Sequence, residues 1–115
     1  MTKRTLSLDA LPPEVRHSLR ELGNRIRSAR LRRRLSQAEL AATLYVTRKT
    51  LARLENGDPG VSLAVFATAL FAFGLHGQLD ELVTPQSDVI GLWHAERQLP
   101  KRVRRRPSDE EKLDF

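Results

Sequence analysis

The sequence predicts an all-α protein: a compact bundle of five helices, followed by a short C-terminal helical segment and a flexible basic tail. Two observations predict this class. Apolar residues recur every three or four positions from Val15 to Ala29, which is one face of an α-helix. Capping residues then precede further short apolar-periodic runs as far as residue 75. With 115 residues, the chain is long enough for one small core and too short for two.

Composition excludes several classes of protein. Cysteine is absent, so neither disulfides nor thiolate sites are available, and the 40% of hydrophobic residues favours a folded domain over general disorder. His17, His76 and His94 lie far apart, without the spacing of metal ligands or a catalytic set. No glycine-rich phosphate loop is present. We therefore expect no enzyme activity, no cofactor and no metal.

The longest apolar run covers residues 61–75 and is fifteen residues long, shorter than the ~20 that a membrane-spanning helix needs. The apolar stretch near the N-terminus is broken by Asp9 and two prolines, which is not typical of an export signal. We therefore expect a cytoplasmic protein without a membrane partner.

Charge is unevenly distributed along the chain, whose formal net charge is +6. Residues 19–57 hold ten basic and three acidic side chains, a local +7, whereas residues 58–100 hold one basic and five acidic ones, a local −4. Residues 101–106, KRVRRR, are basic again. Such alternating blocks indicate separate partners for separate segments.

The first predicted helix covers residues 13–34 and follows a flexible N-terminal arm, residues 1–12. Pro13 suits the first helical position, and Glu14 adds a favourable charge at the positive end of the helix dipole. Six arginines on its outer face, with few acidic neighbours, are suited to DNA phosphates. They are Arg20, Arg25, Arg27, Arg32, Arg33 and Arg34.

Residues 37–57 predict two short helices joined by a tight turn. Ser36 and Glu39 form a capping box before the first, and Thr47 can cap the second, which ends near Gly57. The apolar positions fold the second helix back across the first, and they are Leu40, Ala41, Val46, Leu51 and Leu54. The positions left exposed on the second helix are Thr47, Arg48, Lys49, Thr50 and Arg53. Two short helices that pack through apolar residues and leave a cationic face exposed on the second helix are typical of a DNA-binding protein.

The motif QAELA, the apolar residues Val46, Leu51 and Leu54 and the closing LENG together resemble the Cro/C1-type (Xre-type) helix-turn-helix domain of phage repressors and bacterial regulators. The similarity covers roughly residues 22–75. It implies a lambda-repressor-like fold over residues 13–84 that binds a double-stranded DNA operator as a homodimer. The resemblance places Gln37, Arg48, Lys49 and Arg53 at the DNA, and the exposed positions Thr47 and Thr50 and the helix cap Ser36 complete the predicted DNA-binding residues.

The resemblance also assigns individual roles within this domain. Gln37 would touch a phosphate or support the recognition helix, and Arg30 and Glu55 match a structural pair that joins the first helix to the third. Tyr45 departs from the pattern because this turn position is usually glycine. Either the turn is distorted, or it tolerates a left-handed residue at a cost of about 1 kcal/mol.

The rest of the domain is predicted to hold a helix after Ser62 and a short fifth helix. In the first of these, Leu63, Phe66, Ala69, Leu70 and Phe73 follow helical spacing and should pack over the first three helices. Gly74 then ends it, and Leu79, Leu82 and Val83 predict the fifth helix. Core packing is the preferred interpretation of the phenylalanines over a ligand pocket.

Residues 85–100 predict a further helical segment that carries the only tryptophan, Trp93. Its apolar surface requires a partner, which is either a second subunit of the dimer or the main domain. The tail, residues 101–115, would add DNA affinity through Lys101, Arg102, Arg104, Arg105 and Arg106. Leu113 and Phe115 at its acidic end are candidates for docking a partner, with an ordinary frayed end as the alternative.

Size, the run GDPGVSLAVFATALFAFGL and the later LPKRVR resemble the HipB-like antitoxins, a branch of the Xre group. This resemblance implies a repressor that autoregulates its own operon and binds a HipA-like kinase toxin. Two alternatives stay open: a stand-alone repressor of the Xre type, and a protein-interaction module with weak DNA binding. RNA binding is disfavoured because the chain has few aromatic residues to stack on bases.

Overall fold

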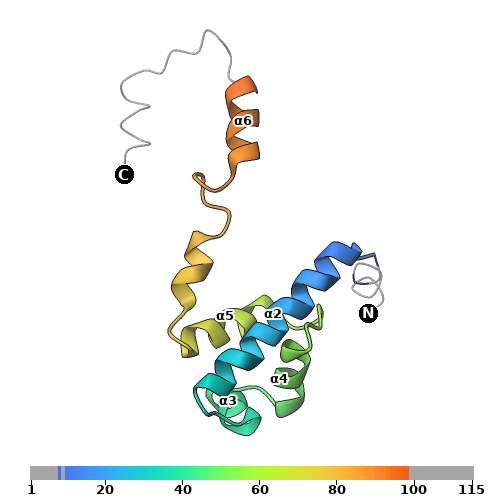
Figure 1. Cartoon of the computed structure of the whole chain (residues 1–115), viewed down its shortest axis with the longest axis vertical. Helices are drawn as coiled ribbons and strands as arrows, with labels where there is room; N and C mark the ends of the chain where they lie inside the picture. Colours follow the sequence, from blue (N-terminus) through green and yellow to red (C-terminus); the bar gives the residue numbers. More distant parts are fainter. Residues whose placement is uncertain (1–7, 9, 99–115) are drawn as a thin grey trace. The chain divides into compact units, whose positions relative to one another are not determined.

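The computed structural model describes residues 8 and 10–98, and every regular element in that part of the chain is helical, which confirms the all-α class (Figure 1). The elements are α2 (Pro13–Arg32), α3 (Gln37–Leu44), α4 (Arg48–Glu55), α5 (Leu63–Ala72), the 3-10 helix η1 (His76–Glu81) and α6 (Val89–Gln98). The chain divides into two compact units, the first ending at Asp80 and the second beginning at Glu81. None of the described helices is long and apolar enough to cross a membrane.

Helix α2 begins as the prolines predict, with Pro12 in extended conformation and Glu14 in the first turn. Its end differs from the prediction. The last helical residue is Arg32, and Arg34 has a left-handed φ of 57°, so the helix stops two residues short of the predicted position. The backbone N–H groups of Arg33 and Arg34 donate to the carbonyls of Arg30 and Leu31, which tightens this end.

Helices α3 and α4 have the predicted caps. Ser36 Oγ accepts from the Glu39 N–H at 3.0 Å while Glu39 Oε1 accepts from the Ser36 N–H at 2.7 Å, which is the full capping box. Thr47 caps α4 by accepting from the Thr50 N–H at 3.1 Å. Gly57, with a φ of 76°, follows the end of α4.

Tyr45 adopts the left-handed conformation that this turn requires, with φ 59° and ψ 39°. The sequence left two alternatives, a distorted turn or a tolerated left-handed residue, and the structure has the second. The left-handed conformation costs about 1 to 2 kcal/mol for a residue with a Cβ. The side chain is 94% exposed, so packing does not offset that cost.

The core of the first unit lies between α2, α3, α4 and α5. Its buried apolar residues are Ile26, Ala29, Leu40, Ala41, Leu44, Leu51, Leu54, Ala69, Leu70 and Phe73. Leu51 is 0% exposed and comes from the middle of α4, so the inner side of this helix is fully enclosed. Burying one such leucine contributes about 1.5 to 3 kcal/mol.

Two expectations for residues 63–83 are wrong. Leu63 is 74% exposed because it is the first residue of α5, at the rim of a surface hollow, and it does not pack over the preceding helices. The fifth helix is a 3-10 helix, and it does not include Leu82 and Val83, which are exposed. Val83 has a left-handed φ of 57°, which prevents helical continuation.

The second unit contains α6. Asp88 caps this helix, because its Oδ1 accepts from the Gly91 N–H at 3.0 Å. Four apolar side chains of α6 are exposed, and they are Val89, Ile90, Leu92 and Trp93. The guanidinium of Arg97 lies 4.6 Å from the centre of the Trp93 ring. The role of this segment in a dimer stays a prediction.

At Gly23, helix α2 lies in close contact with the end of α4. A Cβ added to Gly23 would lie 2.6 Å from the Glu55 carbonyl oxygen and 2.7 Å from the Gly57 nitrogen. Both neighbours are backbone atoms, so a side chain here must push the end of α4 away from α2.

We expect Gly23→Ala to destabilise the fold by about 1 to 3 kcal/mol, the usual cost of overpacking. The matched control is Gly77→Ala, because a Cβ at Gly77 meets nothing within 4 Å. Chemical denaturation of both variants measures the difference. Equal stability of the two variants would contradict the close approach.

Candidate nucleic-acid interface

Helix α4, the predicted recognition helix, has a buried side and a cationic exposed side. Leu51, Leu54 and Glu55 are buried, whereas Arg48 and Lys49, in its first turn, are exposed. Neither cation forms an ion pair with any described residue. Two free cations at the start of a rigidly packed helix can donate to the edges of bases or to phosphates.

A buried ion pair joins α2 to the recognition helix. Arg30 Nε donates to Glu55 Oε2 at 2.7 Å, and Arg30 Nη2 donates to Glu55 Oε1 at 3.1 Å. The two residues are only 6% and 4% exposed. A bidentate pair fixes direction as well as distance, so α4 is held against α2 in one orientation.

The same pair also contacts the residues at the start of α3. Arg30 Nη1 donates to the Leu35 carbonyl at 2.9 Å, and Gln37 Nε2 donates to Glu55 Oε1 at 3.1 Å. The structure thus brings Gln37 to Glu55, at the C-terminal end of α4. Whether Gln37 supports this helix or contacts a phosphate stays a prediction. Every buried polar side-chain atom in the described residues has a hydrogen-bond partner.

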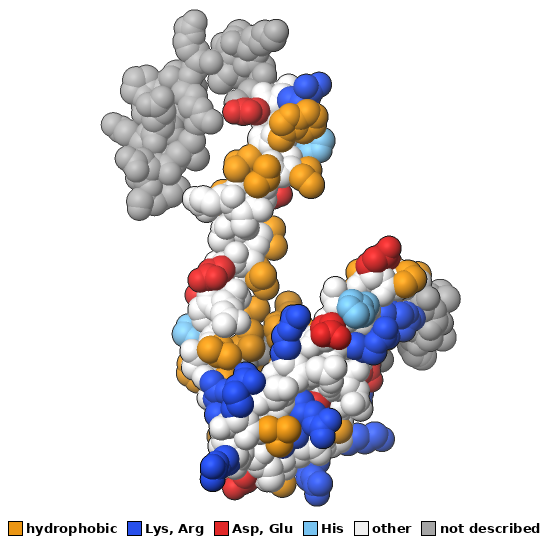
Figure 2. Space-filling view, viewed as in Figure 1, with side chains coloured by type: hydrophobic (Ala, Val, Ile, Leu, Met, Phe, Trp, Pro, Cys, Tyr) orange, Lys and Arg blue, Asp and Glu red, His pale blue; other side chains and the backbone are white. Residues whose placement is uncertain are grey.

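A polar hollow opens between α2, the start of α3 and α4. It is lined by Asn24, Arg27, Arg30, Ser36, Gln37, Arg48, Ala52, Glu55 and Asn56. Arg27 and Arg48 are exposed at its edge, above the buried ion pair. Lys and Arg side chains are spread over the part of the molecule that holds α2 to α4 (Figure 2). A phosphate beside this hollow would meet positive charge from both α2 and α4.

The hydroxyls of Thr47 and Thr50 are engaged with each other. Thr47 Oγ1 accepts from the Thr50 N–H and donates to Thr50 Oγ1 at 3.1 Å. Thr47 is exposed and Thr50 is half-buried. Their first function is therefore to cap α4, which places the adjacent Arg48 at the tip of the helix.

Arg53 differs from the other predicted base-contacting residues because it is already paired. Its Nε donates to Asp58 Oδ2 at 2.8 Å, and Asp58 Oδ1 accepts from the Gly60 N–H at 2.7 Å. The hydrogen bond from Arg53, followed by that from Gly60, lowers the pKa of Asp58 below its ordinary value of 3.8. The carboxylate in turn raises the pKa of Arg53. The loop after α4 thereby holds the Nε edge of this guanidinium.

Several predicted site residues lie outside the described residues. They are the tail cations Lys101, Arg102, Arg104, Arg105 and Arg106, the docking residues Leu113 and Phe115, and the N-terminal arm apart from Leu8 and residues 10–12. Within the described ranges, no group of His, Asp and Glu side chains could hold a metal ion.

A family model for the helix-turn-helix domain matches residues 21–82. The chain belongs to the helix-turn-helix domain family. A search of curated proteins found no match. The matched segment contains α3, the Tyr45 turn and α4, and helix-turn-helix domains place the second of these two helices in the major groove of DNA. The match therefore supports a DNA-binding protein.

We expect Arg30→Met to destabilise the fold by about 3 to 5 kcal/mol, because it leaves the Glu55 carboxylate buried without a counter-charge. The double variant Arg30→Met/Glu55→Met removes both charges and should recover most of that loss. Urea unfolding measures both values. If the double variant is less stable than the single one, the unpaired charge is not the cause.

Stability at low pH tests the Arg53–Asp58 pair. The pKa of Asp58 is lower in the folded protein than its ordinary value of 3.8, so the Arg53–Asp58 pair stabilises the fold at pH values above 3.8. This stabilisation is lost as the pH falls through the pKa of the folded state. We therefore expect wild type to exceed Asp58→Asn in stability at neutral pH, and this difference to shrink below about pH 4. Asp80→Asn, at an exposed carboxylate with no ion pair among the described residues, is the control. A difference that does not change with pH would contradict the pairing.

Proposed function

We propose that this helix-turn-helix protein is a sequence-specific transcriptional repressor that binds a double-stranded DNA operator in the cytoplasm. The observation that carries the proposal is the pair of exposed cations, Arg48 and Lys49, which form no ion pair with any described residue and lie at the tip of a helix that a buried ion pair joins to α2. Repression follows when an operator occupied by the protein excludes the transcription machinery.

Base recognition is assigned to the first turn of α4. Arginine and lysine donate to guanine O6 and N7 in the major groove, and each good contact contributes about 1 to 3 kcal/mol of discrimination. Arg48 and Lys49 are exposed and have no ion-pair partner among the described residues, so they bind bases without first breaking an internal contact. Arg53 is held at its Nε by Asp58, which leaves fewer of its donors and less freedom of orientation for a base than Arg48 and Lys49 have.

Phosphate contacts come from the surface around the polar hollow. Arg27 of α2 lies beside the start of α3, whose backbone N–H groups and Ser36 cap favour an anion. These contacts position the domain along the duplex without reading sequence. The basic residues 101–106 would add salt-dependent affinity, which stays a prediction for a segment outside the described residues.

A homodimer is the assembly that fits this mechanism. Two recognition helices bind half-sites about one helical turn, ~34 Å, apart when the operator has two-fold symmetry. The exposed Val89, Ile90, Leu92 and Trp93 of α6 supply apolar surface for such an association.

The finer proposal is a HipB-like antitoxin that autoregulates its operon and binds a HipA-like kinase toxin. It is supported by the sequence resemblance in residues 57–75 and in LPKRVR, and by the apolar-acidic end with Leu113 and Phe115 as docking residues. The proposal requires a kinase gene beside the gene for this chain. Absence of such a gene would leave the stand-alone repressor.

One observation favours a second function, a protein-interaction module with weak DNA binding. The apolar side chains of α6 are exposed and take no part in DNA recognition. Under this alternative, Trp93 and its neighbours would be needed for association with a partner, while Arg48 and Lys49 would be dispensable.

Substitution of the tip cations tests the proposed function. Operators are first selected from a random pool of duplexes with the wild-type protein. Arg48→Ala and Lys49→Ala should each lower affinity for the selected operator by about 1 to 3 kcal/mol, and affinity for random duplex much less. Fluorescence anisotropy with both duplexes at one fixed salt concentration measures the two losses.

The matched control is Arg25→Ala, which removes an exposed arginine of α2 that does not line the polar hollow. It should leave operator preference unchanged. Equal losses on operator and random duplex for Arg48→Ala and Lys49→Ala, or failure to select any operator, would favour the interaction module.

A further inference from the structure

Tyr45 occupies the turn between α3 and α4 in a conformation that no packing of its side chain compensates. Its backbone is left-handed, with φ 59° and ψ 39°, which is unfavourable for a residue with a Cβ. Glycine adopts this conformation without that cost. The side chain is 94% exposed, so the ring and the hydroxyl face solvent. Residues held in strained backbone conformations cluster at functional sites, which directs attention to what this side chain could bind.

The backbone on both sides of the ring is held firmly. The Tyr45 N–H donates to the Ala42 carbonyl at 3.2 Å, and the Val46 N–H donates to the Ala41 carbonyl at 3.0 Å. Val46 packs against the core, and Thr47 caps α4. The ring therefore leaves the surface at a determined point, and only its two side-chain torsions are left to order on binding.

The turn adjoins the tip cations of α4. Tyr45 precedes Arg48 by three residues, so their Cα atoms are at most about 11 Å apart. The major groove of DNA is about 12 Å wide, and the phosphates of the two strands form its walls. When Arg48 and Lys49 reach the edges of bases, the phosphates at one wall of the groove are within reach of Tyr45.

The chemistry of tyrosine favours a phosphate over a base at this place. Its phenolic O–H is protonated near neutral pH and donates one hydrogen bond, and tyrosine is among the side chains that bind DNA phosphate oxygens. Stacking of the ring on a base requires an unstacked base, which an intact duplex does not offer. The hydroxyl can therefore bind a phosphate that the tip cations attract.

We propose that the Tyr45 hydroxyl donates a hydrogen bond to a backbone phosphate of the operator, beside the major groove that α4 enters. This inference rests on the proposed function, because it requires DNA at the tip of α4. It deepens that function by assigning a positioning contact to the turn itself. Since phosphates carry no sequence information, the contact strengthens binding to any duplex and leaves operator preference unchanged.

Tyr45→Phe tests the contact, because it keeps the ring and the left-handed backbone and removes only the hydroxyl. Affinity should fall about 3- to 10-fold on the selected operator, the usual effect of one hydrogen bond, and by the same factor on random duplex. Fluorescence anisotropy with both duplexes at one fixed salt concentration measures the two losses.

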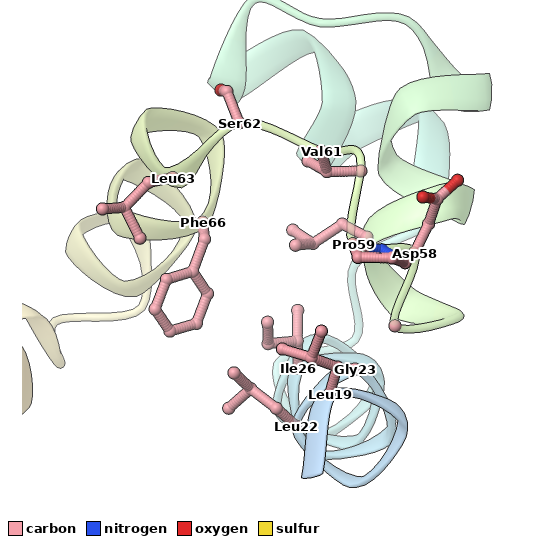
Figure 3. A pocket seen from close by; sticks show the side chains of 12 residues that line it. Leu19, Leu22, Gly23, Ile26, Asp58, Pro59, Val61, Ser62, Leu63 and Phe66 are labelled. Carbon is pink, nitrogen blue, oxygen red and sulfur yellow. The ribbon is translucent and has the colours of Figure 1, made fainter. Parts of the chain in front are cut away.

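The matched control is Leu63→Ala, which shortens another large exposed side chain. Leu63 is 74% exposed and lies beside Phe66 on α5, at the apolar hollow between α2 and α5 (Figure 3). It does not line the polar hollow at the tip of α4. Leu63→Ala should therefore leave both affinities unchanged.

Operators with a single neutral phosphate locate the partner of the hydroxyl. Each phosphate of the selected operator is replaced in turn by a methylphosphonate, which removes its charge. At the contacted position the wild type should lose several-fold more affinity than Tyr45→Phe, because the variant has no hydrogen bond left to lose there. At every other position the two proteins should lose affinity by the same factor.

Tyr45→Gly separates DNA binding from folding. Removal of the Cβ relieves the left-handed strain, so the urea midpoint of unfolding should rise. DNA affinity should nevertheless fall at least as much as it does in Tyr45→Phe. A tyrosine that served only the structure of the turn would not give these opposite changes.

Three outcomes would overturn the proposal. Tyr45→Phe could bind both duplexes as tightly as the wild type, its loss could be confined to the operator, which indicates a base contact, or no methylphosphonate position could distinguish it from the wild type. The proposed function stands in all three cases if Arg48→Ala still lowers operator preference. Absence of duplex binding by the wild type would overturn both.

Discussion

The placement of the recognition helix depends on the buried ion pair between Arg30 and Glu55. Burial of two charges is costly, and the cost is offset here because all three guanidinium nitrogens donate: Arg30 binds both carboxylate oxygens and the Leu35 carbonyl, and Gln37 binds the same carboxylate. The pair therefore connects α2, the start of α3 and the end of α4 at one point. Its main contribution is orientation, since apolar residues of the same size could provide comparable stability.

The geometry around this pair accounts for the chemistry of the exposed surface. At Gly23 the backbones of α2 and α4 come too close for a side chain, and Leu51 encloses the inner side of α4 completely. The opposite tip of α4, capped by Thr47, presents Arg48 and Lys49 to solvent. DNA thus meets cations whose backbone positions are already determined, so little ordering of the backbone is left for the moment of binding.

Local features of the structure could be predicted from the sequence, and features that depend on tertiary contacts could not. The caps at Ser36 and Thr47 and the start of α2 are short-range signals, and the structure has them. The Arg53–Asp58 pair was missed because it depends on how the loop after Gly57 folds back. A turn aspartate five residues after an arginine was the only signal. Leu63 was misassigned because helical spacing indicates a face but not how much of it is covered.

The most direct test of the account is the affinity of the wild-type protein for its selected operator when guanine is replaced by 7-deazaguanine, which lacks the N7 acceptor in the major groove. The account predicts a loss of about 1 to 3 kcal/mol at each contacted guanine, and no further loss there once Arg48 and Lys49 are both alanine. Unchanged affinity at every substituted guanine would contradict major-groove recognition by α4.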